Sequence, residues 1–118
     1  MSASMHEKRK NQRIPIAMTV QSVEIEPIGF GYAFNISRQG LGVDALAMVK
    51  EKKVPEKGAD LKLKFKIPKS EHYISALATV VYIDFEDQGH PKIGFEFKDI
   101  SNESLDAIEA YIKQFPRT

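Results

Sequence analysis

Two groups of residues have the types and spacing to bind a flat, anionic ligand. Arg9 and Arg13 lie four positions apart, which would place both guanidinium groups on one face of a helical turn. Asn35, Ser37 and Gly40 form the second group, about twenty residues further along the chain. A guanidinium fork grips phosphate or the O6/N7 edge of guanine, and an amide and a hydroxyl can each donate and accept hydrogen bonds. This combination suits a guanine-containing nucleotide.

The sequence offers no recognisable catalytic centre. His6, His72 and His90 stand singly, without the i, i+4 pair of a zinc site, and there is no cysteine to act as nucleophile or metal ligand. Ser37 is not part of a GxSxG motif, and neither GxxxxGK[ST] nor GxGxxG occurs. We therefore expect a protein that is not an enzyme, with no catalytic residues, no metal and no cofactor other than its ligand.

Length and charge narrow the class of protein further. The chain has 118 residues, which suits one domain, and a net charge of +1 from 17 Lys and Arg against 16 Asp and Glu. This balance argues against nucleic acid as the partner, although basic residues gather at positions 8–13. No apolar run approaches the roughly 20 residues of a membrane span, and the first residues do not resemble a secretory signal. We expect a cytoplasmic protein that does not insert into membranes.

Apolar residues at every second position predict strands around a single core. We expect six strands, at residues 17–25, 30–37, 41–44, 60–67, 73–85 and 92–98. A change to helical period then predicts an amphipathic helix over residues 102–115, with Ser101 as its N-cap. Such an order favours an all-β fold, a six-stranded antiparallel barrel with a C-terminal α-helix. Residues 1–13 would form a flexible basic arm, and residues 14–118 the barrel domain.

The same alternation predicts which side chains face the core. Asn35 and Ser37 would point away from it, and Gly40 would allow a positive φ or a close backbone approach at the following turn. The pattern predicts no element for residues 45–59. Four large residues of the strand at 30–37 would point inward: Phe30, Tyr32, Phe34 and Ile36. One face of the strand at 73–85 would carry Leu77, Val81, Ile83 and Phe85. Its other face is also fairly apolar and could be covered too, with Ala76, Ala78, Val80 and Tyr82. The apolar helix stripe would carry Leu105, Ile108, Ile112 and Phe115.

The two polar groups also match the motifs of a known family. Residues 9–13 fit RxxxR and residues 35–40 fit [DN]xSxxG, so that the chain resembles the PilZ domain over nearly its whole length. The resemblance implies a β-barrel that binds the bacterial second messenger cyclic di-GMP. It implies that Arg9 and Arg13 hold guanine and phosphate groups, and that Gly40 shapes the turn. Asn35 and Ser37 would contact the second guanine or its sugar-phosphate. Secondary contacts could come from Lys8, Lys10 and Arg38.

The resemblance implies a receptor whose arm becomes ordered on ligand binding and signals to a partner protein in motility, attachment or exopolysaccharide control. Three other functions stay open: an adaptor of the same fold that binds no nucleotide, a small barrel that binds oligonucleotides, and an undetected hydrolase. The residues themselves also allow a simpler reading. Arg9 and Arg13 could belong to a solvated basic arm, while Asn35 and Ser37 could be turn formers that hydrogen-bond their own backbone.

Overall fold

The computed structural model describes residues 14–15, 21–67, 70–85 and 91–114. Its first four strands are β1 (Ile14–Pro15), β2 (Gln21–Glu26), β3 (Gly29–Ile36) and β4 (Gly40–Asp44). A short helix, α2 (Leu46–Lys50), precedes the longer strands β5 (Asp60–Lys66), β6 (Tyr73–Asp84) and β7 (Lys92–Asp99). Helix α3 (Asn102–Ile112) follows β7. The strand predicted at 17–25 is therefore seen as β2, and residues 17–20 lie outside the described residues.

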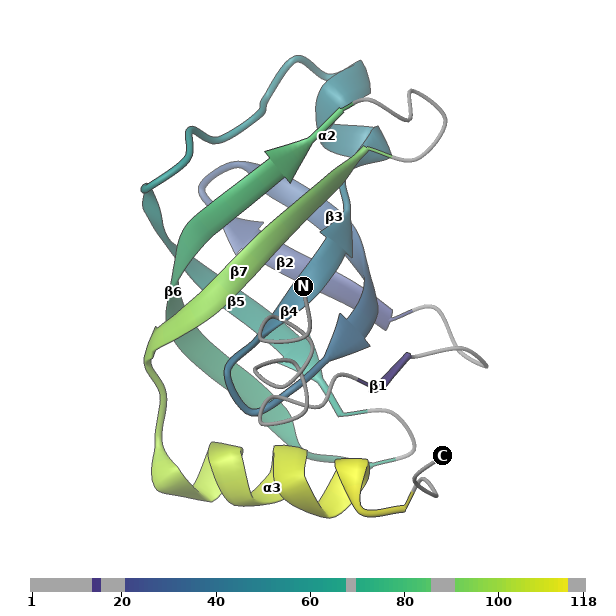
Figure 1. Ribbon diagram of the computed structural model, residues 1–118, viewed down its shortest axis with the longest axis vertical. Helices are drawn as coiled ribbons and strands as arrows, with labels where there is room; N and C mark the ends of the chain where they lie inside the picture. Colours follow the sequence, from purple (N-terminus) through teal and green to yellow (C-terminus); the bar gives the residue numbers. More distant parts are fainter. Residues whose placement is uncertain (1–13, 16–20, 68–69, 86–90, 115–118) are drawn as a thin grey trace, which may run out of the picture.

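The strands close into an antiparallel barrel, as Figure 1 shows. The order around the sheet is β3-β2-β5-β6-β7-β4, and a further pairing of β3 with β4 joins its two edges. The two-residue strand β1 also pairs with β3, at a part of β3 that lies beyond the residues paired with β2. The closed six-stranded barrel with a C-terminal helix confirms the predicted fold, and closure leaves those six strands without a free edge.

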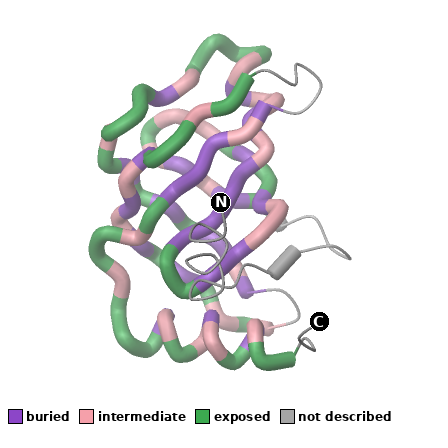
Figure 2. The backbone as a smooth tube through the Cα atoms, viewed as in Figure 1, coloured by how far each residue is buried: buried purple, intermediate pink, exposed green. Residues whose placement is uncertain are grey.

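The core is built from alternate residues of the barrel strands (Figure 2). Strand β5 shows this most simply, because its leucines and Phe65 are buried while its lysines at 62 and 64 are exposed. The Phe65 ring stacks on Phe97 of β7, with the ring centroids 6.3 Å apart. The largest residues with almost no exposed surface include Ile25, Ile36, Leu41, Met48, Leu63, Ile74, Ile93, Phe95 and Ile108.

The two helices lie at opposite ends of the barrel (Figure 1). Helix α3 starts at the predicted cap, where the Ser101 hydroxyl accepts a hydrogen bond from Ser104 N at 3.1 Å. It ends at Ile112 rather than at residue 115, and its buried face is formed by Ser104, Ile108 and Tyr111. Within the part of the chain that the structure describes, neither helix has the length and apolar character needed to cross a bilayer.

The predicted inward face of β3 is wrong at its first two aromatic residues. Phe30 and Tyr32 are 55% and 47% exposed, whereas Gly31 and Ala33 are buried. A Cβ on Gly31 would overlap the side chain of Val43, so this part of the interior has no room for a large residue. Ile36 is buried as predicted, because a bulge between Ala33 and Asn35 reverses the alternation.

Two further expectations also differ from the structure. In β6 the buried side is formed by Ile74, Ala76, Ala78 and Val80, which belong to the second apolar face of the pattern, while Val81 is 36% and Phe85 41% exposed. Register shifts at Leu77/Ala78 and Val80/Tyr82 disturb the simple alternation of this strand. Residues 45–59 contain α2, which the pattern did not predict, and its Met48 is buried in the core.

Candidate functional site

The [DN]xSxxG motif forms the hairpin turn between β3 and β4. Ser37 N donates to Gly40 O at 2.9 Å, and Gly40 N donates to Ser37 O at 3.3 Å. The Ser37 hydroxyl accepts from Gln39 N at 3.1 Å, and Ser37 is completely buried. The expectation that Ser37 points away from the core is therefore wrong. Its hydroxyl closes the turn, as a serine in a turn often does.

Gly40 is required by a close approach of two strands. A Cβ at this position would collide with the carbonyl group of Phe95 and approach Glu96 Cα, both in the neighbouring strand β7. Gly40 is not among the described residues with positive φ, so of the two reasons expected for this glycine the close approach is the one observed. Phe97 N also donates to Gln39 O at 2.7 Å, which ties the turn to β7.

Asn35 lies half-buried at the bulge of β3. Its Oδ1 accepts a hydrogen bond from Gly42 N at 3.0 Å, which bridges β3 and β4 just where their register shifts. Asn35, Ser37 and Gly40 therefore come together in one hairpin, as the motif requires. The side chains of Asn35 and Ser37 both accept hydrogen bonds from the local backbone, so the turn-forming reading describes what they do in this structure.

Strand β1, which follows the N-terminal candidates in the chain, pairs with the motif end of β3. Ile14 pairs with Ile36, and Pro15 pairs with Asn35, in antiparallel register. Lys8, Arg9, Lys10 and Arg13 themselves lie outside the described residues. What the structure describes is the backbone that directly follows them, beside the motif end of β3.

Arg38 connects the hairpin turn to the terminal helix. Its Nε lies 2.9 Å from Glu109 Oε2 of α3, and the two side chains are 57% and 37% exposed. A pair this exposed adds little stability. It nevertheless places a guanidinium group at the turn, where the sequence suggested a secondary ligand contact.

A row of glycines and aromatic rings next to the motif was not anticipated from the sequence. Gly42 of β4 pairs with Gly94 of β7, which in turn pairs with Tyr82 of β6. The Phe34 ring lies over Gly42, so that a Cβ added to Gly42 would be only 2.6 Å from Phe34 Cζ. The Tyr82 ring lies over Gly94 in the same way. Isolated glycines inside strand patterns were the available signal, because they often mark a close approach.

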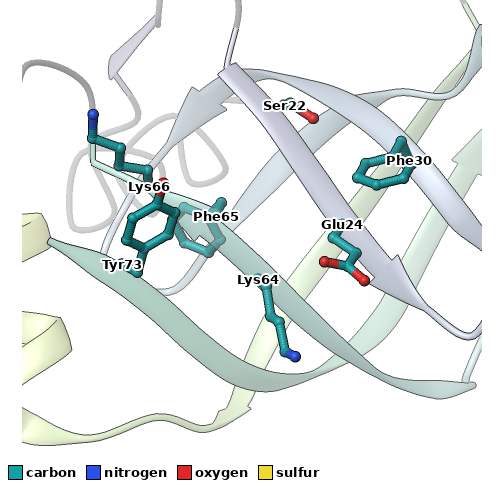
Figure 3. Close-up of a pocket in the computed structure, with 7 residues that line it drawn as sticks. All are labelled: Ser22, Glu24, Phe30, Lys64, Phe65, Lys66 and Tyr73. Carbon is teal, nitrogen blue, oxygen red and sulfur yellow. The ribbon is translucent and has the colours of Figure 1, made fainter. Parts of the chain in front are cut away.

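A separate open pocket of about 380 Å³ lies on the outer surface of β2, β3, β5 and β6. Figure 3 shows Phe30 on one side of it and Tyr73 on the other, with Glu24 and Lys64 between them. None of the motif residues that the structure describes, Asn35, Ser37 and Gly40, lines this pocket. The described residues also hold no cluster of three or more His, Cys, Asp or Glu side chains that could bind a metal.

Comparisons with known proteins agree with this geometry. The chain is similar to the solved structure of the Bacillus subtilis inhibitor of motility MotI/DgrA, with a TM-score of 0.72 and 23% sequence identity. The similarity covers 90% of this chain but 50% of that protein, so the chain spans about half its length and the match shows a shared fold. No curated protein matches the sequence.

The family comparison covers most of the chain. A family model for the PilZ domain matches residues 7–114, which include the RxxxR segment, the hairpin, the barrel and α3. This match confirms the resemblance seen in the motifs. PilZ domains are receptors and adaptors related to cyclic di-GMP signalling. The chain belongs to the PilZ domain family.

Proposed function

We propose that this protein is a receptor for cyclic di-GMP. In the proposed complex, Arg9 and Arg13 grip guanine and phosphate groups of a ligand that lies against the barrel wall beside Asn35. Binding orders the basic arm and thereby creates a surface for a partner protein. The family suggests that this partner acts in motility, attachment or exopolysaccharide synthesis.

The pairing of β1 with β3 is the observation that carries this proposal. Ile14 lies opposite Ile36, within the [DN]xSxxG motif, and Arg13 precedes Ile14 by one peptide unit, or about 3.8 Å between Cα atoms. The residue that directly follows the RxxxR motif is therefore a strand partner of the [DN]xSxxG motif. This pairing supports a ligand site that both motifs share.

Burial changes the role that we propose for Ser37. Its hydroxyl is engaged with Gln39 N and has no exposed surface, so the residue acts by fixing the turn. The fixed turn then positions Arg38 and the backbone near Asn35. Ser37→Ala should therefore weaken ligand binding indirectly, and it should also lower the stability of the free protein by about 1 kcal/mol, the usual net value of one hydrogen bond.

Calorimetric titration with cyclic di-GMP tests the proposal. Arg9→Ala and Arg13→Ala should each weaken binding by about 1.5–3 kcal/mol, the range for hydrogen bonds to charged groups. Lys53→Ala is a suitable control, because this exposed lysine follows α2, at the end of the barrel opposite α3. It should bind as tightly as the wild type. Absence of binding by the wild-type protein at sub-millimolar ligand would refute the receptor and favour the adaptor.

Two additional measurements separate the remaining functions. An oligonucleotide-binding barrel would bind single-stranded RNA or DNA with strong salt dependence, and the oligonucleotide would compete with cyclic di-GMP. A hydrolase would convert cyclic di-GMP to a linear product during prolonged incubation, which chromatography detects. The receptor should return the ligand intact and should ignore the oligonucleotide.

A further inference from the structure

A continuous row of residues crosses four strands on the outer wall of the barrel. Asn35 of β3 pairs with Gly42 of β4, Gly42 pairs with Gly94 of β7, and Gly94 pairs with Tyr82 of β6. Three strand intervals span about 14 Å at the usual spacing. The row therefore starts at a residue of the proposed ligand site and ends at an exposed aromatic ring.

Two aromatic rings, those of Phe34 and Tyr82, lie over this row, and they differ in the groups that contact their outer faces. The Phe34 ring lies over Gly42, and Lys92 Nζ is 5.6 Å from its centroid. The Tyr82 ring packs against Gly94, and the residue is 39% exposed. Among the described residues, no other ring and no cation lies over Tyr82. Tyr82 thus offers a ring supported by backbone on one side and open to solvent on the other.

Gly94 makes this arrangement possible. A Cβ at residue 94 would overlap three atoms of the Tyr82 ring, so any other residue would push the ring away from the wall. An aromatic ring held against a wall in this way is a surface on which nucleobases stack. Beside this ring, Lys92 of β7 lies opposite Asp84 of β6, and its Nζ is over the Phe34 ring rather than over Tyr82.

We propose that Tyr82 is a base-stacking residue for one guanine of cyclic di-GMP. This inference rests on the proposed function and adds a contact from β6, outside both sequence motifs. With the base on Tyr82, the rest of the ligand lies toward Asn35 at the other end of the row. The glycine pair forms the floor between the two ends of the ligand.

Binding measurements on three variants test the stacking role. Tyr82→Leu should weaken cyclic di-GMP binding by about 5- to 150-fold, the usual effect of losing one base–aromatic stack. Tyr82→Phe keeps the ring and should bind within about twofold of the wild type. Tyr73→Leu is the matched control, because Tyr73 is a 72% exposed tyrosine at the other end of the same strand. It should bind like the wild type.

A spectroscopic reporter distinguishes stacking from an indirect loss of structure. The chain contains no tryptophan, so Tyr82→Trp introduces a single indole at the proposed contact. Stacked guanine should quench its fluorescence on titration, whereas an indole introduced by Tyr73→Trp should not respond. The fluorescence of Tyr82→Trp still tests the stacking role if Tyr82→Leu folds poorly.

The outcomes separate this inference from the function on which it rests. If the wild-type protein binds cyclic di-GMP but Tyr82→Leu binds equally well and Tyr82→Trp is not quenched, the stacking role is wrong and the receptor stands. If the wild-type protein binds no cyclic di-GMP, the proposed function itself is overturned. Quenching at residue 82 together with weaker binding by Tyr82→Leu supports both.

Discussion

Gly40 and Gly94 both lie where a side chain would collide, but with different groups. A methyl group on Gly40 would meet backbone atoms of Phe95 and Glu96, whereas one on Gly94 would meet only the Tyr82 ring, which can rotate away. We expect Gly40→Ala to lower the free energy of unfolding by about 2 kcal/mol or more, as overpacking does. Gly94→Ala should lower the free energy of unfolding clearly less than Gly40→Ala does. Parallel urea unfolding curves would measure both, and equal losses would contradict this account.

Residue types alone could identify the hairpin, but they could not explain it. The spacing of Asn35, Ser37 and Gly40 indicated a polar turn with a glycine that is difficult to replace. The sequence could not show that the backbone of Phe95 crowds Gly40, because this contact joins strands that are far apart in the chain. Nor could it show that Ser37 is buried, since a short polar side chain near a turn is exposed in many proteins.

Helix α3 depends on packing far more than on its cap or its surface ion pair. Ile108 is fully buried, so Ile108→Ala should cost about 2–5 kcal/mol of stability. Loss of the cap hydrogen bond in Ser101→Ala should cost about 1 kcal/mol. Arg38→Ala removes an exposed pair with Glu109 and should cost less than about 1 kcal/mol. Chemical unfolding should rank the three variants in this order.

A different ranking would change the interpretation of α3. If Arg38→Ala were as destabilising as Ile108→Ala, the ion pair with Glu109 would be holding the helix on the barrel end. A ligand that attracts Arg38 could then release α3. The exposure of both side chains argues against such a role in the free protein.

At the level of elements, the sequence predicted the extent of the strands, but it missed the buried face of the irregular ones. Strand β5 has strict alternation and no bulge on its pairing with β6, so its period identified both its extent and its buried face. In β3 and β6 the bulges reverse the alternation part-way along the strand, and a single inward face therefore does not exist. Helix α2 has five residues, too few for a helical period to be visible.

The closed barrel places side by side residues that the chain order separates. Strand β7 lies between β4 and β6, so the motif hairpin and Tyr82 share one wall although α2 and β5 come between them in the chain. Sequence motifs can identify only the first of these two regions. The second follows from strand order, which residue patterns did not determine. The proposed binding site on the outer wall would also leave the core free of functional constraints.

Exposed ion pairs on the barrel surface should make the stability of the whole molecule pH-dependent. Glu26 accepts from Lys64, with N and O 3.1 Å apart, and this hydrogen bond lowers the pKa of Glu26 and raises that of Lys64. Hydrogen bonds from Lys98 and Thr79 lower the pKa of Asp60. Among the groups that titrate at high pH, Tyr111 has its pKa raised by burial.

The signs of these pKa shifts predict how stability changes at low and high pH. A carboxylate whose pKa is lowered in the folded state stabilises that state above its unfolded pKa, and the contribution disappears as the pH falls through the folded value. Stability should therefore decline below about pH 4.5, the ordinary pKa of a glutamate. The raised pKa values of Lys64 and Tyr111 mean that stability should also decline above about pH 10, the ordinary pKa of a tyrosine.

Urea unfolding midpoints measured between pH 3 and pH 7 test the acidic side of this prediction. The double variant Glu26→Gln and Asp60→Asn should lose less stability than the wild type on acidification, because it no longer has the two carboxylates whose protonation is penalised. Glu71→Gln, at an exposed glutamate between β5 and β6, should retain the wild-type profile. Because the ion pairs are exposed, 1 M salt should reduce the difference between the double variant and the wild type. If the double variant were as acid-sensitive as the wild type, these two carboxylates would not be the groups that destabilise the barrel at low pH.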